Sequence, residues 1–141
     1  MPMFPEGAVV VLLQARDGVV IVRDPTHADP QWKFPGGNIE PGETSIRAAQ
    51  RELKQETGVF VLAISRFEVL LREKRYTKIP HTRVFVGVDA KEYTSAELGL
   101  KPRGETGEET KVVSVEDLNE QLELKDHRKL LRDLARLSRV A

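Results

Sequence analysis

GNIEPGETSIRAAQRELKQETGV, from Gly37 to Val59, carries start and stop signals for one helix, around which the rest of the chain can be placed. Thr44 or Ser45 can cap the first turn, since a side-chain oxygen there accepts a hydrogen bond from a free backbone N–H. Gly58 tolerates the left-handed conformation that often follows the last helical turn. The stretch therefore predicts a helix that runs to about Thr57.

Three oxygen-bearing side chains of this predicted helix lie on one side. At 3.6 residues per turn, Glu52 and Glu56 lie one turn apart and Gln55 shares their side, so three side-chain oxygens project together. The opposing apolar side is formed by Ile46, Ala48, Ala49 and Leu53. Two carboxylates at this spacing repel each other unless a positive charge lies between them, and the oxygen-seeking cation Mg²⁺ supplies one. A solvated helical face, with Arg51 and Lys54 as counterions, is the alternative.

The spacing of these residues resembles the signature of the Nudix hydrolases. That signature runs Gly, five residues, Glu, seven residues, Arg-Glu-aliphatic, any residue, Glu-Glu, any residue and Gly-aliphatic. The matching residues of this sequence are Gly37, Glu43, Arg51, Glu52, Leu53, Glu56, Gly58 and Val59. Gln55 stands where the family has the first glutamate of its Glu-Glu pair. The match favours the metal site over the solvated face.

The resemblance implies a metal site and gives roles to its residues. The carbonyl of Gly37 and the side chains of Glu52, Gln55 and Glu56 are the implied ligands of Mg²⁺, with Mn²⁺ as a substitute. Gln55 would supply a neutral oxygen, which ligates a cation but neutralises less of its charge. Glu52 and Glu56 are the implied catalytic residues. Glu52 is either a ligand or the base that takes the proton of the attacking water.

Two further roles follow from the same resemblance. In the family, a glutamate at the position of Glu43 pairs with the arginine at Arg51 and holds the preceding loop on the helix. An additional glutamate ligand often comes from a loop late in the chain, where this sequence has Glu105, Glu108 and Glu109. We expect Glu108 or Glu109 to reach the metal, and surface charge is the alternative for both.

Composition limits the class of protein. A length of 141 residues predicts one domain, residues 1–141, and 22 basic against 22 acidic residues give no net charge. We therefore expect no broad basic field of the kind that binds extended nucleic acid. The sequence has no cysteine, no signal-peptide pattern at its start and no apolar run near the roughly 20 residues of a membrane span. We expect a soluble cytoplasmic protein with a small nucleotide as its partner and no membrane association; the sequence does not indicate its oligomeric state.

Apolar runs on both sides of the motif predict a sheet. The predicted strands are Gly7–Ala15 and the VVIVR run after it, which form a hairpin, then Phe60 to about Arg75, Thr82–Asp89 and Val112–Val115. A short helical turn is expected from Glu116 to Leu118. A basic amphipathic helix is expected over Asp126–Arg139, with Leu130, Leu131, Leu134 and Leu137 on its buried side. These elements predict an α+β fold, a mixed β-sheet sandwiched between helices, which is similar to the Nudix fold.

Two residues outside the motif are candidates for binding substrate. Arg23 ends a predicted strand and can reach a phosphate, and a solvated strand end is the alternative. Tyr76 lies 17 residues beyond Val59. Nudix enzymes that cleave dinucleoside polyphosphates resemble one another by carrying a tyrosine in this region, whereas those that cleave ADP-ribose carry a proline nearer the motif. A tyrosine ring can stack on a base, and a loop or core aromatic is the alternative.

The resemblance implies a reaction as well. Water attacks phosphorus in a nucleoside diphosphate linked to another moiety, and a phosphate or nucleotide leaves. Candidate substrates are dinucleoside polyphosphates, oxidised nucleoside triphosphates such as 8-oxo-dGTP, and nucleotide sugars. Because Gln55 replaces a motif glutamate, the alternative is a nonhydrolytic module of the same fold that binds a nucleotide or acts as a sensor.

Overall fold

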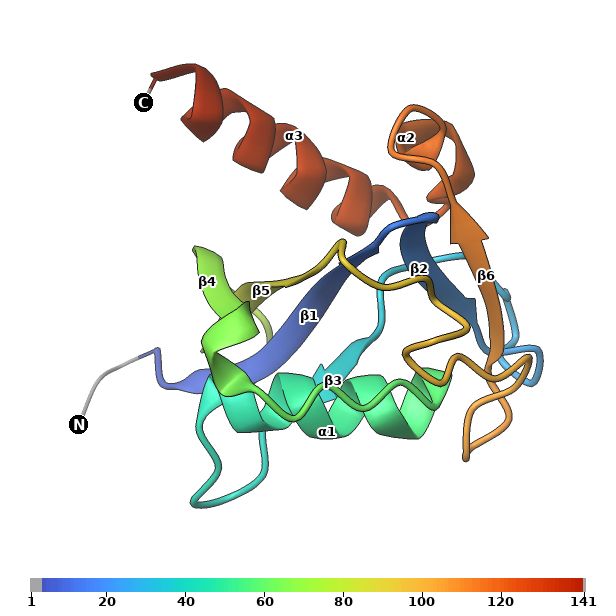
Figure 1. Ribbon diagram of the computed structural model, residues 1–141. Coiled ribbons are helices and arrows are strands. Elements are labelled where there is room, and N and C mark those ends of the chain that lie inside the picture. The colour runs from blue at the N-terminus through green and yellow to red at the C-terminus, as the bar shows by residue number, and fades with distance from the viewer. Residues whose placement is uncertain (1–3, 141) are drawn as a thin grey trace.

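Residues 4–140, which the computed structural model describes, form a six-stranded mixed sheet with helices on both faces (Figure 1). Side chains are described as far as residue 135. The elements in chain order are β1 (Glu6–Ala15), β2 (Gly18–Arg23), β3 (Gly36–Asn38), α1 (Ser45–Thr57), the 3₁₀ turn η1 (Ile64–Arg66), β4 (Phe67–Arg75), β5 (His81–Ala90), β6 (Glu109–Val113), α2 (Leu118–Gln121) and α3 (Lys125–Val140). The expected α+β class is confirmed.

The sheet is organised around β1. Its strand order is β4-β5-β1-β2-β6, and β3 pairs with β1 beside this path. β1 runs parallel to β5 and antiparallel to β2 and β3. In the β1–β3 register, Val9 lies opposite Gly37 and Val10 opposite Gly36. The glycine loop that leads into α1 is therefore anchored to the central strand.

Side chains alternate along β1 and divide the core into two layers, as the two-residue period of a strand requires. Val9, Val11 and Leu13 pack in a cluster with the apolar side of α1. Val10 packs on the other face, in a cluster with Phe34 and with Leu130 of α3. Figure 1 shows this arrangement, with α1 against one face of the sheet and α3 over the other.

Local signals fix the bounds of α1 as expected. Thr44 is the N-cap, and its hydroxyl oxygen accepts from the amide of Arg47 at 3.2 Å. Gly58 has φ of +82° and donates its N–H to the carbonyl of Lys54 at 2.9 Å. The apolar side is also as expected, since Ala48, Ala49 and Leu53 are fully buried and Ile46 packs against them.

Several other boundaries differ from the sequence expectation. The strand expected over Val112–Val115 is β6, three residues earlier at its start, and Val115 is 52% exposed. The segment from Phe60 to Ala63 is irregular, so β4 begins only at Phe67. The short helical turn begins at Leu118, two residues later than expected.

The C-terminal helix was expected over Asp126–Arg139 and forms over Lys125–Val140. Leu130 is buried and Leu131 and Leu134 pack partly against the same cluster, whereas the side chain of Leu137 lies outside the described residues. Within the described part of the chain, none of the helices combines the length and apolar character that a membrane span requires.

Candidate functional site

Glu56 is a buried carboxylate in the last turn of α1. Its side chain reaches β3, where the backbone N–H of Gly36 donates to Oε2 across 2.7 Å. The residue is only 7% exposed. The pKa of Glu56 is raised to about 8, mainly because a buried carboxylate loses the hydration of its charged form and also because of the negative charges of Glu52 and Glu108. The Gly36 hydrogen bond opposes this rise without cancelling it.

Glu52 lies one turn earlier and contacts the next residue of β3. A Cβ atom built on Gly37 would lie 2.6 Å from Oε1 of Glu52, closer than side chains approach one another. Only glycine therefore lets the loop come this near to the carboxylate without displacing it. Glu52 and Glu56 thus face adjacent glycines of one short strand.

Arg51 donates hydrogen bonds both to the loop before α1 and to side chains of α1 itself. Its guanidinium donates to both carboxylate oxygens of Glu43, at 2.8 and 2.9 Å, and to the carbonyl of Asn38 at 2.9 Å. A third nitrogen, Nη1, donates to Oε1 of Glu52 at 2.9 Å and to Oε1 of Gln55 at 3.2 Å. The hydrogen bonds that Arg51 donates to Glu43 hold the pKa of the Glu43 carboxyl below its usual range. The expected pairing of Glu43 with Arg51 is confirmed, and it fixes the loop before α1 on the helix.

The loop before β6 closes over the C-terminal end of α1. The amide of Glu105 donates to the backbone carbonyl of Gln55 at 2.7 Å, and Lys101 donates to the carbonyl of Thr57 at 2.9 Å. The negative charge of Glu108 contributes to the raised pKa of Glu56. The carboxylate of Glu109 instead pairs with Arg23, with both contacts at 3.0 Å. Of the two glutamates expected near the metal, Glu109 is thus engaged by Arg23, whereas Glu108 accepts a hydrogen bond from the hydroxyl of Thr106.

The residues fit a divalent cation by the chemistry of their oxygens. Within the described residues no group of three or more His, Cys, Asp or Glu side chains is gathered closely enough to form a metal cluster. Glu56 nevertheless has a buried carboxylate, a second carboxylate one turn away and no ion pair in the described chain, although the positive charge of Lys33 lowers its pKa somewhat. Glu52, Glu56 and Glu108 with a β3 carbonyl are oxygen ligands of the kind that Mg²⁺ prefers.

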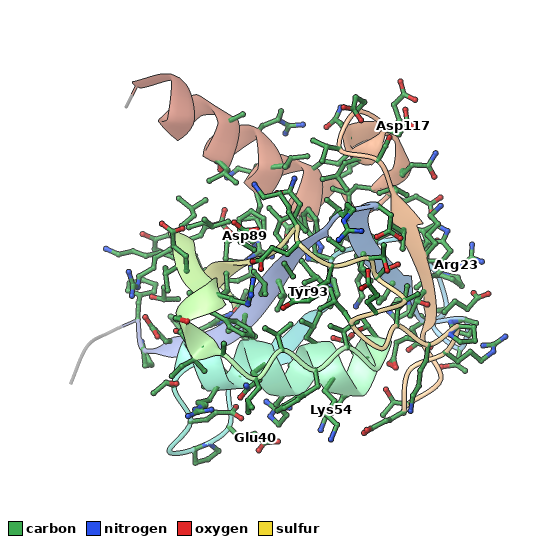
Figure 2. All side chains as sticks on the ribbon, viewed as in Figure 1. Arg23, Glu40, Lys54, Asp89, Tyr93 and Asp117 are labelled. Carbon is green, nitrogen blue, oxygen red and sulfur yellow. The ribbon has the colours of Figure 1, made fainter. Side chains whose placement is uncertain are left out.

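Arg23 and Tyr76, the expected substrate contacts, have other partners in the structure. Arg23 is beside β6 (Figure 2), and its guanidinium lies 4.6 Å from the ring centre of Trp32. Tyr76 follows β4, is 80% exposed and meets the ring of Phe4 edge-on at 5.1 Å. Among the described residues, no hydrogen bond, ion pair or ring contact joins either of them to Glu52 or Glu56.

The sequence reasoning missed two groups of this site. One is the Gly36 amide, a backbone donor to Glu56. The other is Lys33, whose charge acts on Glu56 although it lies 23 residues away in the sequence. By contrast Lys54 projects from the outer side of α1, away from the sheet (Figure 2), as a solvent-facing residue of this helix should.

Comparison with known protein families finds a match to one family. The model of the NUDIX domain matches residues 3–134. A protein of Bacillus subtilis (strain 168) named "Putative 8-oxo-dGTP diphosphatase" is 33% identical over 72 residues, which are 51% of this chain and 47% of that protein. The Mus musculus bis(5'-nucleosyl)-tetraphosphatase [asymmetrical] is 31% identical over 85 residues, 59% of this chain and 51% of the relative. The chain thus matches about half the length of these relatives.

Solved structures share the fold at low sequence identity. A structure of MutT, described for Aliivibrio salmonicida and Vibrio cholerae, has a TM-score of 0.71 at 21% identity and covers 90% of this chain and 94% of its own. The C. elegans Ap4A hydrolase has a TM-score of 0.62 at 18% identity, covering 92% and 96%. These likenesses establish the arrangement of strands and helices.

Proposed function

The chain belongs to the NUDIX domain family, and from this premise we propose that it is a Mg²⁺-dependent pyrophosphohydrolase that cleaves a nucleoside diphosphate linked to another moiety. The observation that carries the proposal is the pair Glu52 and Glu56, which faces the glycines of β3 and of which Glu56 is buried. The charged form of a buried carboxyl with a pKa of about 8 is unfavourable unless something positive compensates it, and Glu56 has no ion pair within the described residues. A divalent cation between these residues and a pyrophosphate meets that need.

Each residue of the site has a part in this proposal. Glu52, Glu56 and Glu108, with the carbonyl of Gly37, would hold the cation, and Mn²⁺ would substitute for Mg²⁺. When bound, the cation neutralises pyrophosphate oxygens and lowers the pKa of the attacking water. Glu52 is the candidate to accept the proton of that water, because Arg51 fixes its carboxylate in place and leaves one oxygen free of that hydrogen bond.

The class of substrate is supported by the relatives and by the sequence. Their names specify 8-oxo-dGTP and bis(5'-nucleosyl) tetraphosphates, both of which contain phosphoanhydride bonds. An exposed Tyr76 is available to stack on a base. We therefore propose dinucleoside polyphosphates and oxidised nucleoside triphosphates as the substrates to examine, and nucleotide sugars as the third class.

The test is phosphate or pyrophosphate release from a panel of these nucleotides. We expect turnover with Mg²⁺ or Mn²⁺ and none in excess chelator. Release that continues in chelator would contradict a metal-dependent reaction, and absence of release from every nucleotide would contradict hydrolysis.

Gln55 favours one other function, a nonhydrolytic module that binds a nucleotide. Its side-chain oxygen accepts from Arg51, so it takes part in the network that holds Glu52, and it adds no charge there. In that case the same nucleotides would bind with micromolar or tighter affinity in the presence of Mg²⁺ and would be recovered intact.

A further inference from the structure

The segment from Trp32 to Phe34 enters the site like a strand with partners on both edges. On one edge, the N–H and carbonyl of Lys33 pair with the backbone of Val22, at 2.9 and 2.8 Å. On the other edge, the carbonyl of Trp32 accepts from the amides of Glu123 and Leu124, at 2.9 and 3.2 Å. The connection between α2 and α3 thus supplies the hydrogen-bond partners that a neighbouring strand would supply.

His127 completes this second edge. The N–H of Phe34 donates to its Nδ1 at 3.0 Å. Phe34 is fully buried and His127 is 6% exposed, and their rings stack with centres 5.6 Å apart and planes 21° apart. Burial and the positive charge of Arg83 lower the pKa of His127 to about 3. At neutral pH the ring is therefore uncharged and its Nδ1 can accept the Phe34 proton.

Only one residue separates this contact from the site. Pro35 follows Phe34, and its carbonyl accepts from the amide of Val11 at 2.8 Å. Gly36 comes next and donates its N–H to Glu56. Proline has a fixed φ and restricts the residue before it, so little rotation is available between Phe34 and Gly36. The direction of the Phe34 N–H therefore constrains the direction of the Gly36 N–H.

We propose that His127 is a positioning residue, which holds the Phe34 amide so that the amide of Gly36 meets the carboxylate of Glu56. The consequence for catalysis rests on the proposed hydrolase function, whereas the geometric effect on Gly36 does not. His127 acts through the backbone and has no described contact with Glu52 or Glu56.

Three variants of the full chain test this role. His127→Leu fills a similar space and removes the acceptor, which leaves a buried amide unpaired. His127→Asn keeps an acceptor oxygen close to the place of Nδ1. Leu130→Ala is the matched control, because Leu130 lies one turn further along α3 and is 1% exposed; it packs in the same apolar cluster as Phe34 but offers no acceptor to the Phe34 amide. Each variant is measured by the Gly36 amide in ¹⁵N NMR, by Mn²⁺ affinity, by kcat and KM, and by its melting temperature.

His127→Leu should move the Gly36 amide resonance and speed its hydrogen exchange at least tenfold. Loss of a residue that orients metal ligands lowers metal affinity or activity about 10–100-fold, so Mn²⁺ affinity and kcat should fall by that factor with little change in KM. His127→Asn should recover most of each loss. Leu130→Ala should lower the melting temperature and leave the Gly36 amide and Mn²⁺ affinity unchanged.

An unchanged Gly36 amide in His127→Leu would overturn the proposal, as would an Asn variant no better than the Leu variant. Equal perturbation by Leu130→Ala would overturn it too, because His127 would then act only through general stability. If the parent protein hydrolyses no nucleotide, the proposed function fails, and the Gly36 amide still decides the role of His127.

Discussion

Gly36 donates its backbone N–H to Oε2 of Glu56 across 2.7 Å, and this contact joins the central sheet to the last turn of α1. One hydrogen bond from a neutral amide offsets only part of the cost of burying a charged carboxylate. The remaining cost is visible in the raised pKa of Glu56. The protein thus places a carboxyl group where its charged form is unfavourable without a cation, which is typical of a functional site.

Glu56→Gln should lower kcat about 10²–10³-fold. The expected loss is roughly 2.7–4 kcal/mol of transition-state stabilisation, by analogy with removal of one preorganised electrostatic group. Steady-state kinetics with Mg²⁺ measures it. Glu68→Gln, at an exposed position of β4, is the control and should leave kcat unchanged.

The same variant should not be less stable than the parent in chelator above pH 8, because glutamine removes a charge that burial disfavours. An unchanged kcat in folded Glu56→Gln protein would remove Glu56 from the mechanism.

Cation binding should depend on pH through Glu56. Its pKa is about 8 in the folded protein and 4.5 ordinarily, so between these values the metal-free folded state holds a proton that the unfolded state has lost. Its stability therefore falls as pH rises through this window. A cation must displace that proton, so Mn²⁺ affinity should rise up to about tenfold per pH unit below pH 8 and level off above it.

Calorimetry in two buffers of different ionisation enthalpy measures the released proton directly. Glu56→Gln should release none. A parent affinity that stays constant from pH 6 to pH 8 would show that Glu56 does not ligate the cation.

The sequence was sufficient to predict the bounds of α1 but not the groups around it. The reason is that helix ends are set by nearby residues, whereas the surrounding groups depend on pairing between distant segments. Thr44 and Gly58 act on their own helix ends, so their effect is visible in a few consecutive residues. The bounds of β6 depend on its pairing with β2, where Val19 lies opposite Val113 and Arg23 opposite Glu109. Because that pairing joins segments some 90 residues apart, the apolar run alone put the strand too late.

The same contrast between local and long-range determinants applies to the site. The carboxylates of Glu52 and Glu56 follow from helical spacing. The acceptor that His127 offers to Phe34 spans 93 residues, and a lone histidine on an amphipathic helix gives no local sign of it. Glu108 and Glu109 were indistinguishable in sequence, and only the pairing of Glu109 with Arg23 separates them.

Gln55→Glu should tighten Mg²⁺ binding and raise turnover, because a hard cation gains more from an anionic oxygen than from an amide. In chelator the contact with Arg51 offsets part of the added repulsion from Glu52 and Glu56. The melting temperature should therefore fall slightly without metal and rise more than that of the parent when Mg²⁺ is added. If neither Mg²⁺ affinity nor kcat/KM increases, residue 55 is not at the metal and the nonhydrolytic function becomes the better explanation.

Tyr76→Ala should raise KM for diadenosine tetraphosphate about tenfold and leave kcat nearly unchanged. Stacking on a base is worth roughly 1–3 kcal/mol and acts equally on the ground and transition states. Ile79→Ala is the matched control, because Ile79 is 79% exposed in the same loop as Tyr76, which is 80% exposed. If ADP-ribose has the higher kcat/KM, or both variants behave alike, Tyr76 has no role in selecting the substrate.

His127 should make the fold sensitive to acid. Its pKa is about 3 in the folded protein, because of burial and then the nearby charge of Arg83, and it is ordinarily 6.5. Between these values the unfolded state binds the proton and the folded state does not, so the stability contributed by neutral His127 is complete above pH 6.5 and is lost as pH falls toward 3. One proton corresponds to about 1.4 kcal/mol per pH unit.

The urea unfolding free energy of the parent should therefore fall about 2–3 kcal/mol more than that of His127→Asn between pH 6.5 and pH 4.5. The comparison cancels the opposite effect of Glu56, which both proteins share. Equal losses in the two proteins would mean that His127 is protonated in the folded state, and its Nδ1 would then have no lone pair for the Phe34 amide.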